Sequence, residues 1–91
     1  MVLGFDMPQP LSPATAEFGR RVRARREKLH LSQEALAREA GVHWTFVGQC
    51  ERGMRNISLH NICKLAAGLG VDRGTLIRGL QPPSCDSRGG C

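Results

Sequence analysis

Residues 31–53 read LSQEALAREAGVHWTFVGQCERG, and this stretch decides the fold. Ser32 is a typical residue before a helix, because its hydroxyl accepts a hydrogen bond from a free backbone N–H. Gly41 ends that helix, since glycine readily adopts the positive φ that closes a helix. A second helix is predicted from about 43 to 52. Two short helices therefore meet at a steep angle across a tight turn.

The flanking sequence predicts three further helices. Ser12 followed by Pro13 suits the start of the first, and Ser58 and Asp72 suit the starts of the last two. No segment alternates as a strand would, so we expect an all-α, compact five-helix domain. The side chains expected to face its core are Phe18, Val22, Leu29, Leu36, Ala37, Ala40, Val47, Cys50, Leu59, Ile62, Leu65, Ala66 and Leu69.

The folded unit is predicted over residues 13–80. Residues 1–12 lack helical periodicity and predict a flexible N-terminal arm, while 81–91 read QPPSCDSRGGC and predict a flexible C-terminal tail. No apolar run suits a membrane span, and the N-terminus does not resemble a signal peptide. We therefore expect a cytoplasmic protein with no membrane partner.

The charge favours an anionic partner. The 91 residues carry a net charge of +5, and 41% of them are hydrophobic, which suits one small folded domain. A basic domain of this size points first to nucleic acid and second to a membrane surface. Membrane binding needs a broad apolar face on the cationic first helix, but the core occupies that face. The 4% aromatic content disfavours a stacking platform for single strands.

The predicted helix pair resembles the helix-turn-helix of the lambda-repressor-like, Xre-type regulators, and the resemblance extends over about 18–80. Residues 55–71, RNISLHNICKLAAGLGV, are especially similar to the controller proteins of restriction–modification systems. The resemblance implies a sequence-specific transcriptional regulator that binds double-stranded DNA as a homodimer. The helix at about 43–52 would enter the major groove, and a palindromic operator would match the two-fold symmetry.

The resemblance also implies roles for individual side chains. The expected base-reading residues are Trp44, Thr45 and Gln49, on the outer face of the second helix of the pair. Glutamine can pair bidentately with adenine, and threonine can donate, accept or contact a thymine methyl. Trp44 has an alternative role in covering the edge of the core. Gly48 lies on the same predicted face, where it would allow close approach to the DNA backbone.

The expected phosphate contacts are Gln33, Arg52, Arg55 and Asn56. Gln33 would also brace the DNA-reading helix, although an exposed glutamine at a helix start is the simpler alternative. Arg52 has a competing interpretation as the ion-pair partner of Glu17 or Glu51. Asn56 also has a competing interpretation, in which its side chain caps its own loop.

Three residues depart from the family pattern: Gly48 inside the second helix, Arg25 and His30. Arg25 occupies a usually apolar position, so we expect its stem to cover the core and its head to reach solvent or phosphate. His30 stands where glycine usually closes the first helix, and histidine tolerates positive φ at some cost.

The last predicted helix carries an apolar stripe formed by Leu76, Ile77 and Leu80. Not all three side chains can point inward from so short a helix, so we expect a two-fold dimer contact. The alternative is that they close the core of a monomer.

The remaining chemistry is sparse. The cysteines lack the spacing of a metal site, so no metal or cofactor is expected. Cys50 and Cys63 are expected to act as small hydrophobic residues, and Cys85 and Cys91 as reduced thiols in the tail. The sequence contains no apparent nucleophile–base pair, so we do not expect the protein to be an enzyme. The alternative function is a protein-interaction module, such as the antitoxin of a toxin–antitoxin pair.

Overall fold

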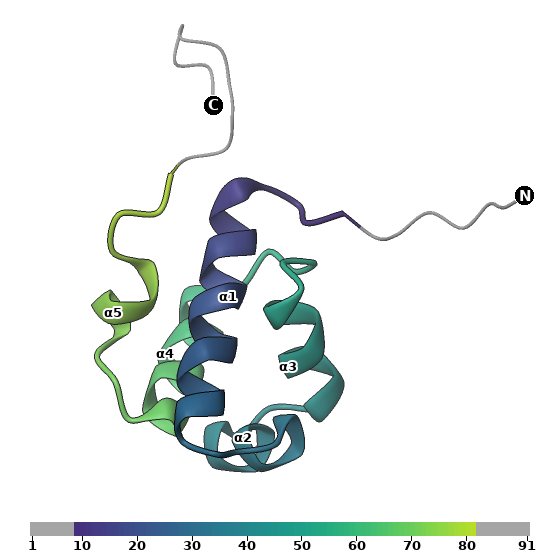
Figure 1. Cartoon of the computed structure of the whole chain (residues 1–91), viewed down its shortest axis with the longest axis vertical. Helices are drawn as coiled ribbons and strands as arrows, with labels where there is room; N and C mark the ends of the chain where they lie inside the picture. Colours follow the sequence, from purple (N-terminus) through teal and green to yellow (C-terminus); the bar gives the residue numbers. More distant parts are fainter. Residues whose placement is uncertain (1–8, 82–91) are drawn as a thin grey trace, which may run out of the picture.

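The computed structural model describes residues 9–81 and places five α-helices in them (Figure 1). They are α1 (Pro13–Lys28), α2 (Gln33–Ala40), α3 (Trp44–Glu51), α4 (Leu59–Leu69) and α5 (Arg73–Ile77). No strand occurs in this part of the chain, and the predicted all-α, five-helix class is confirmed. The predictions for the outer parts of the arm and tail, including Cys85 and Cys91, lie outside the described residues.

Local side-chain caps set the predicted helix starts. The Ser12 hydroxyl oxygen accepts the backbone N–H of Thr15 at 3.1 Å, and the Thr15 hydroxyl oxygen accepts that of Ser12 at 3.0 Å. Ser32, Ser58 and Asp72 cap α2, α4 and α5 in the same way. The predicted starts of these helices are therefore confirmed. His30 follows α1 with a φ of 59°, the positive value that its position predicted.

The core lies between α1 and the other helices. Its buried side chains are Phe18, Val22, Leu36, Ala37, Ala40, Val47, Cys50, Leu65, Ala66, Leu69 and Leu76. Burial raises the pKa of the Cys50 thiol to about 12, so this cysteine stays protonated and packs as a small hydrophobic residue. Cys63 is only half-buried.

Two expected core residues are exposed instead. Leu59 is 70% exposed because it is the first residue of α4, which begins at the surface. Leu29 is 37% exposed because it lies one position beyond the last turn of α1. Both core predictions were wrong, because periodicity identifies a helix face but does not fix where the packed part of that face ends.

The helix α1 crosses α3 at very short range. A Cβ atom added at Gly19 would lie 2.2 Å from the carbonyl oxygen of Cys50, so only glycine fits at this crossing.

At the other end of α1, Arg25 donates through Nε to the carbonyl oxygen of Leu69 at 3.2 Å. This bond satisfies a free carbonyl at the end of α4, while the half-buried Arg25 side chain still reaches the surface, as expected.

None of the helices in residues 9–81 combines the length and apolarity needed to cross a bilayer.

Candidate DNA interface

The turn between α2 and α3 has the predicted geometry. Gly41 adopts a φ of 74° and a ψ of 37°, and its N–H donates to the carbonyl of Ala37 at 2.8 Å. The N–H of Val42 donates to the same carbonyl at 3.0 Å. This left-handed ending stops α2 within one residue, and α3 begins three residues later at Trp44.

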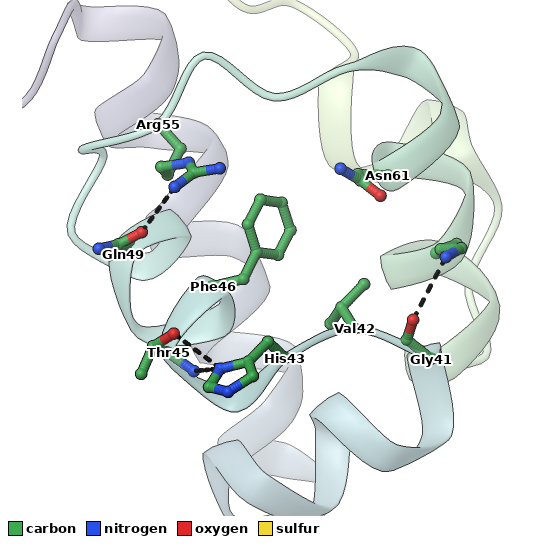
Figure 2. Close-up of a pocket in the computed structure, with 9 residues that line it drawn as sticks. Gly41, Val42, His43, Thr45, Phe46, Gln49, Arg55 and Asn61 are labelled. Carbon is green, nitrogen blue, oxygen red and sulfur yellow. Dashed lines mark hydrogen bonds between the residues drawn. The ribbon is translucent and has the colours of Figure 1, made fainter.

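The start of α3 is capped by a residue that the sequence did not single out. The Nδ1 atom of His43 accepts the backbone N–H of Thr45 at 3.1 Å and lies 2.8 Å from the Thr45 hydroxyl oxygen (Figure 2). The imidazole also stacks on the indole of Trp44, with ring centroids 6.1 Å apart. Histidine is not among the usual capping residues, so sequence preference gave no signal here.

The predicted base-reading residues lie along one accessible edge of α3. Trp44 is 50% exposed, Thr45 is exposed and Gln49 is half-exposed. Half of the indole surface is exposed and half is covered, so the base-reading role of Trp44 and its role in covering the edge of the core both stay predictions. These three side chains are accessible to a duplex, and their contacts with bases stay a prediction.

Gly48 does not share that edge. It is buried, and an added Cβ would lie 3.4 Å from Gln33 Oε1 and 3.6 Å from Arg52 Nη1. The expectation that Gly48 allows close approach to DNA was wrong, because the Gln33 and Arg52 side chains cover it.

The end of α3 is fixed by a network that joins three helices. Arg26 Nε donates to Glu51 Oε2 at 2.6 Å, and Arg26 Nη2 donates to Glu51 Oε1 at 3.0 Å. Gln33 Nε2 donates to the same Oε1 atom at 3.0 Å. The Glu51 side chain is only 4% exposed and that of Arg26 12%, so this is a nearly buried ion pair. Hydrogen bonding to Glu51 raises the pKa of Arg26.

This network gives Gln33 the bracing contact that the resemblance implied, since it ties the start of α2 to the end of α3. The two carboxylates considered as partners of Arg52 are bonded to other arginines. Glu51 is taken by Arg26, and Glu17 pairs with Arg20 and Arg21 on α1. Within residues 9–81, Arg52 makes no ion pair and is exposed, so its guanidinium is available for a phosphate.

Arg55 and Asn56 follow α3 but lie in different surroundings. Arg55 lies over the ring of Phe46 and donates to the Gln49 side chain, beside the accessible edge of α3. Asn56 is exposed and lines a groove between α1, α4 and α5 instead. Its side chain makes no hydrogen bond within the described residues, so the structure gives no support for a loop cap.

A polar hollow of about 360 Å³ adjoins the turn, between α3 and the start of α4 (Figure 2). Its lining includes Gln49, Arg55, Asn61 and Lys64, and no carboxylate contributes to it. Lys64 Nζ donates to the carbonyl oxygen of Gly41 at 3.2 Å, which holds this cation against the turn. The sequence analysis missed Asn61 and Lys64, because nothing local brings α4 to the helix pair.

The apolar stripe at the C-terminal end divides between the core and the surface. Leu76 is 1% exposed and belongs to the core, so its assignment to a dimer contact was wrong. Ile77 is 37% exposed and Leu80 is half-buried, and both line the groove that contains Asn56. Of the predicted stripe, only these two side chains are accessible to a second protomer.

Two short helices joined by a left-handed glycine turn, with the second presenting an accessible edge beside Arg52, Arg55 and Lys64, define a helix-turn-helix domain. The family profile described as helix-turn-helix matches residues 22–76, which run from α1 to α5. The chain belongs to this helix-turn-helix family. The predicted class, a DNA-binding transcriptional regulator of the lambda-repressor-like, Xre type, is confirmed.

Known relatives agree with the resemblance to controller proteins. The chain is 40% identical to the control protein C.BamHI of Bacillus amyloliquefaciens, and the match covers 78% of this chain and 89% of that protein. It superimposes on the restriction–modification controller protein C.AhdI of Aeromonas hydrophila with a TM-score of 0.67 and 45% identity, covering 68% of this chain and 94% of that one. The P22 c2 repressor in complex with a synthetic operator gives a TM-score of 0.64 and 34% identity, covering 68% of this chain and 94% of that one.

Proposed function

We propose that the protein is a dimeric, sequence-specific regulator that inserts α3 into the major groove of a palindromic operator. The observation that carries this proposal is the contrast between the two sides of α3. One side is fixed by the Arg26–Glu51–Gln33 network, and the other presents Trp44, Thr45 and Gln49. A rigidly held helix with an accessible polar edge is the arrangement that reads bases in the major groove.

The positions of the cations around α3 support the same orientation of this helix in the major groove. Arg52 and Arg55 lie at the end of α3, and Lys64 lies across the hollow beside the turn. Cations that flank a reading helix on both sides are placed to contact the phosphates along the groove, and such contacts fix register without reading sequence. Gln33, at the start of α2, is a further proposed phosphate contact. The predicted phosphate contact of Asn56 is not part of this set, because Asn56 lines the groove between α1, α4 and α5.

The proposed dimer contact lies on the side of the domain formed by α4 and α5. Ile77 and Leu80 line an apolar groove there, and Leu59 on α4 is 70% exposed. A two-fold axis through this side would carry two copies of α3 about one helical turn of DNA apart.

The dimer proposal predicts the effect of Ile77→Asp. A charge at the centre of an apolar two-fold contact is repeated on both protomers, so we expect this variant to sediment as a monomer where the parent sediments as a dimer. Leu29→Asp is the matched control, since Leu29 is also 37% exposed but lies at the end of α1. If both variants remain dimeric, the contact lies elsewhere.

The similarity to controller proteins supports a role in regulating a restriction–modification system. A transcriptional regulator of this kind acts in the cytoplasm and needs no catalytic centre or cofactor. The protein-interaction function considered above stays an alternative prediction.

The proposed function is tested by in vitro selection from a random duplex library at one moderate salt concentration. We expect enrichment of a palindrome whose half-sites lie about 10 bp apart. Enrichment of a single half-site would keep base reading but contradict the dimer. Binding that depends on salt but enriches no sequence would contradict the proposed role of α3 and favour a protein partner.

A further inference from the structure

Gln49 on α3 and Arg55 in the following loop form one unit at the accessible edge of α3. Arg55 Nη1 donates to Gln49 Oε1 at 3.0 Å, and the guanidinium carbon lies 5.1 Å from the ring centroid of Phe46. Figure 2 shows the two polar side chains pointing toward each other, with the Phe46 ring beside them. A side chain from the loop is thus fixed against α3 on two sides.

The Phe46 ring, on which Arg55 lies, is held in place by the core. Phe46 is half-buried and packs against the core, so its ring gives the guanidinium a fixed surface. A cation over an aromatic face is attracted by the ring quadrupole, and the planar arginine fork loses little further freedom when it forms a hydrogen bond. No carboxylate lines this hollow, so no acidic group there competes for Arg55.

The contact changes what Gln49 can recognise. A glutamine reads adenine through two bonds, donating to N7 and accepting from the N6 amino group. Here the amide oxygen already accepts from Arg55, and the adjacent positive charge repels the hydrogens of an approaching amino group. The amide nitrogen has no partner within residues 9–81, so its two donors remain free for a base acceptor.

We propose that Arg55 is a positioning residue for base recognition, which orients Gln49 to donate to acceptor-rich base edges. In the major groove guanine presents two acceptors, and thymine presents one acceptor with a methyl group. Adenine and cytosine both present an amino donor at this edge, which the Gln49–Arg55 unit does not match. The half-site position read by Gln49 is therefore guanine or thymine, and not the adenine with which an unconstrained glutamine can pair bidentately. This inference rests on the proposed function of α3.

The test repeats the selection with the parent protein and with Gln49→Ala, Arg55→Ala and Arg52→Ala. Gln49→Ala identifies the position that Gln49 reads, because the preference there disappears. At that position we expect the parent to favour guanine or thymine over adenine by about fivefold or more. Arg55→Ala frees the amide oxygen, so adenine should rise there to at least the level of guanine. Arg52→Ala removes an equal charge and should leave the preference unchanged.

A second readout needs no DNA. In the free protein, Arg55→Ala should shift the side-chain amide resonances of Gln49 in a ¹⁵N-correlated NMR spectrum, and Arg52→Ala should not. Both arginines are exposed, so neither change removes a core contact.

The outcomes separate this inference from the function on which it rests. A parent that selects no motif overturns both. A parent that selects a motif, with adenine or cytosine at the Gln49 position, overturns the orientation of Gln49 alone. An Arg55→Ala variant that keeps the parental preference and loses affinity equally for all duplexes makes Arg55 a phosphate contact only. Gln49 resonances that do not respond to Arg55→Ala overturn the contact itself.

Discussion

The two ends of α3 are held in different ways. At its C-terminal end, Glu51 is nearly buried and is bonded to side chains from α1 and α2. At its N-terminal end, His43 caps the helix from an exposed position and stacks on a half-exposed Trp44. Polar side-chain contacts from α1 and α2 therefore anchor the C-terminal end of α3, whereas no such network holds its N-terminal end, where Trp44 and Thr45 are exposed. The same helix provides both rigidity and an accessible surface.

The largest expected effect comes from breaking the anchored end. Glu51→Ala leaves Arg26 nearly buried without its partner, which should lower the free energy of unfolding by about 3–5 kcal/mol in urea titrations. Glu27→Ala is the control, since it removes the partner of Arg23 in an exposed pair and should cost about 1 kcal/mol or less. Similar losses in the two variants would show that the Glu51 network does not anchor α3.

The next largest effects are expected at two glycines in the packing of α3: Gly19 on α1, where that helix crosses α3, and Gly48 within α3 itself. Gly19→Ala places a methyl group against the Cys50 carbonyl, so we expect a loss of about 1–3 kcal/mol in the free energy of unfolding. Gly48→Ala meets only ordinary contacts with Gln33 and Arg52, and alanine favours the helix by up to about 1 kcal/mol. Opposite signs for the two variants are therefore expected in thermal or urea unfolding. A destabilised Gly48→Ala would mean that Gln33 cannot adjust.

A smaller effect is expected at the exposed end. His43→Ala removes the acceptor for the Thr45 N–H, which should cost about 0.5–2 kcal/mol of stability by urea unfolding. His43→Asn restores a capping acceptor and should recover most of that loss. If His43→Ala is as costly as Glu51→Ala, the two ends of α3 are equally anchored and the contrast fails.

The smallest effect on the fold is expected for Arg52→Ala, because this exposed side chain has no ion-pair partner in the described residues. Stability should change by less than about 0.5 kcal/mol. Operator affinity should fall, and the slope of its salt dependence should decrease by about one counterion. An unchanged slope in binding titrations would place Arg52 away from phosphate.

The sequence predicted those features of the fold that depend on neighbouring residues. Ser12, Ser32 and Asp72 cap their helices through bonds that span two or three positions, so their chemistry is visible in the local pattern. The glycine turn between α2 and α3 is local in the same way. The positions of Leu59 and Leu29 were missed because they depend on where each helix stops packing.

The sequence predicted which edge of α3 is accessible, but it did not predict the side-chain contacts that support this edge. The family pattern identified the accessible edge of α3 but placed Gly48 on it. The residues that support that edge come from distant segments, since Arg26 and Glu51 are 25 positions apart and Lys64 is 23 from Gly41. Such pairs leave no local signal. The bond from Arg55 to Gln49 depends on how the loop folds back, which residue preferences do not define.

The most direct test of the central claim uses Trp44, the only tryptophan in the chain. Because its indole is half-exposed on α3, its emission reports contact between that helix and DNA. Titration with the selected operator should change the Trp44 fluorescence and saturate at one half-site per protomer, with a much smaller change for a scrambled duplex at the same salt concentration. Tight operator binding, measured by the anisotropy of labelled DNA, with unchanged Trp44 emission would contradict the placement of α3 in the groove.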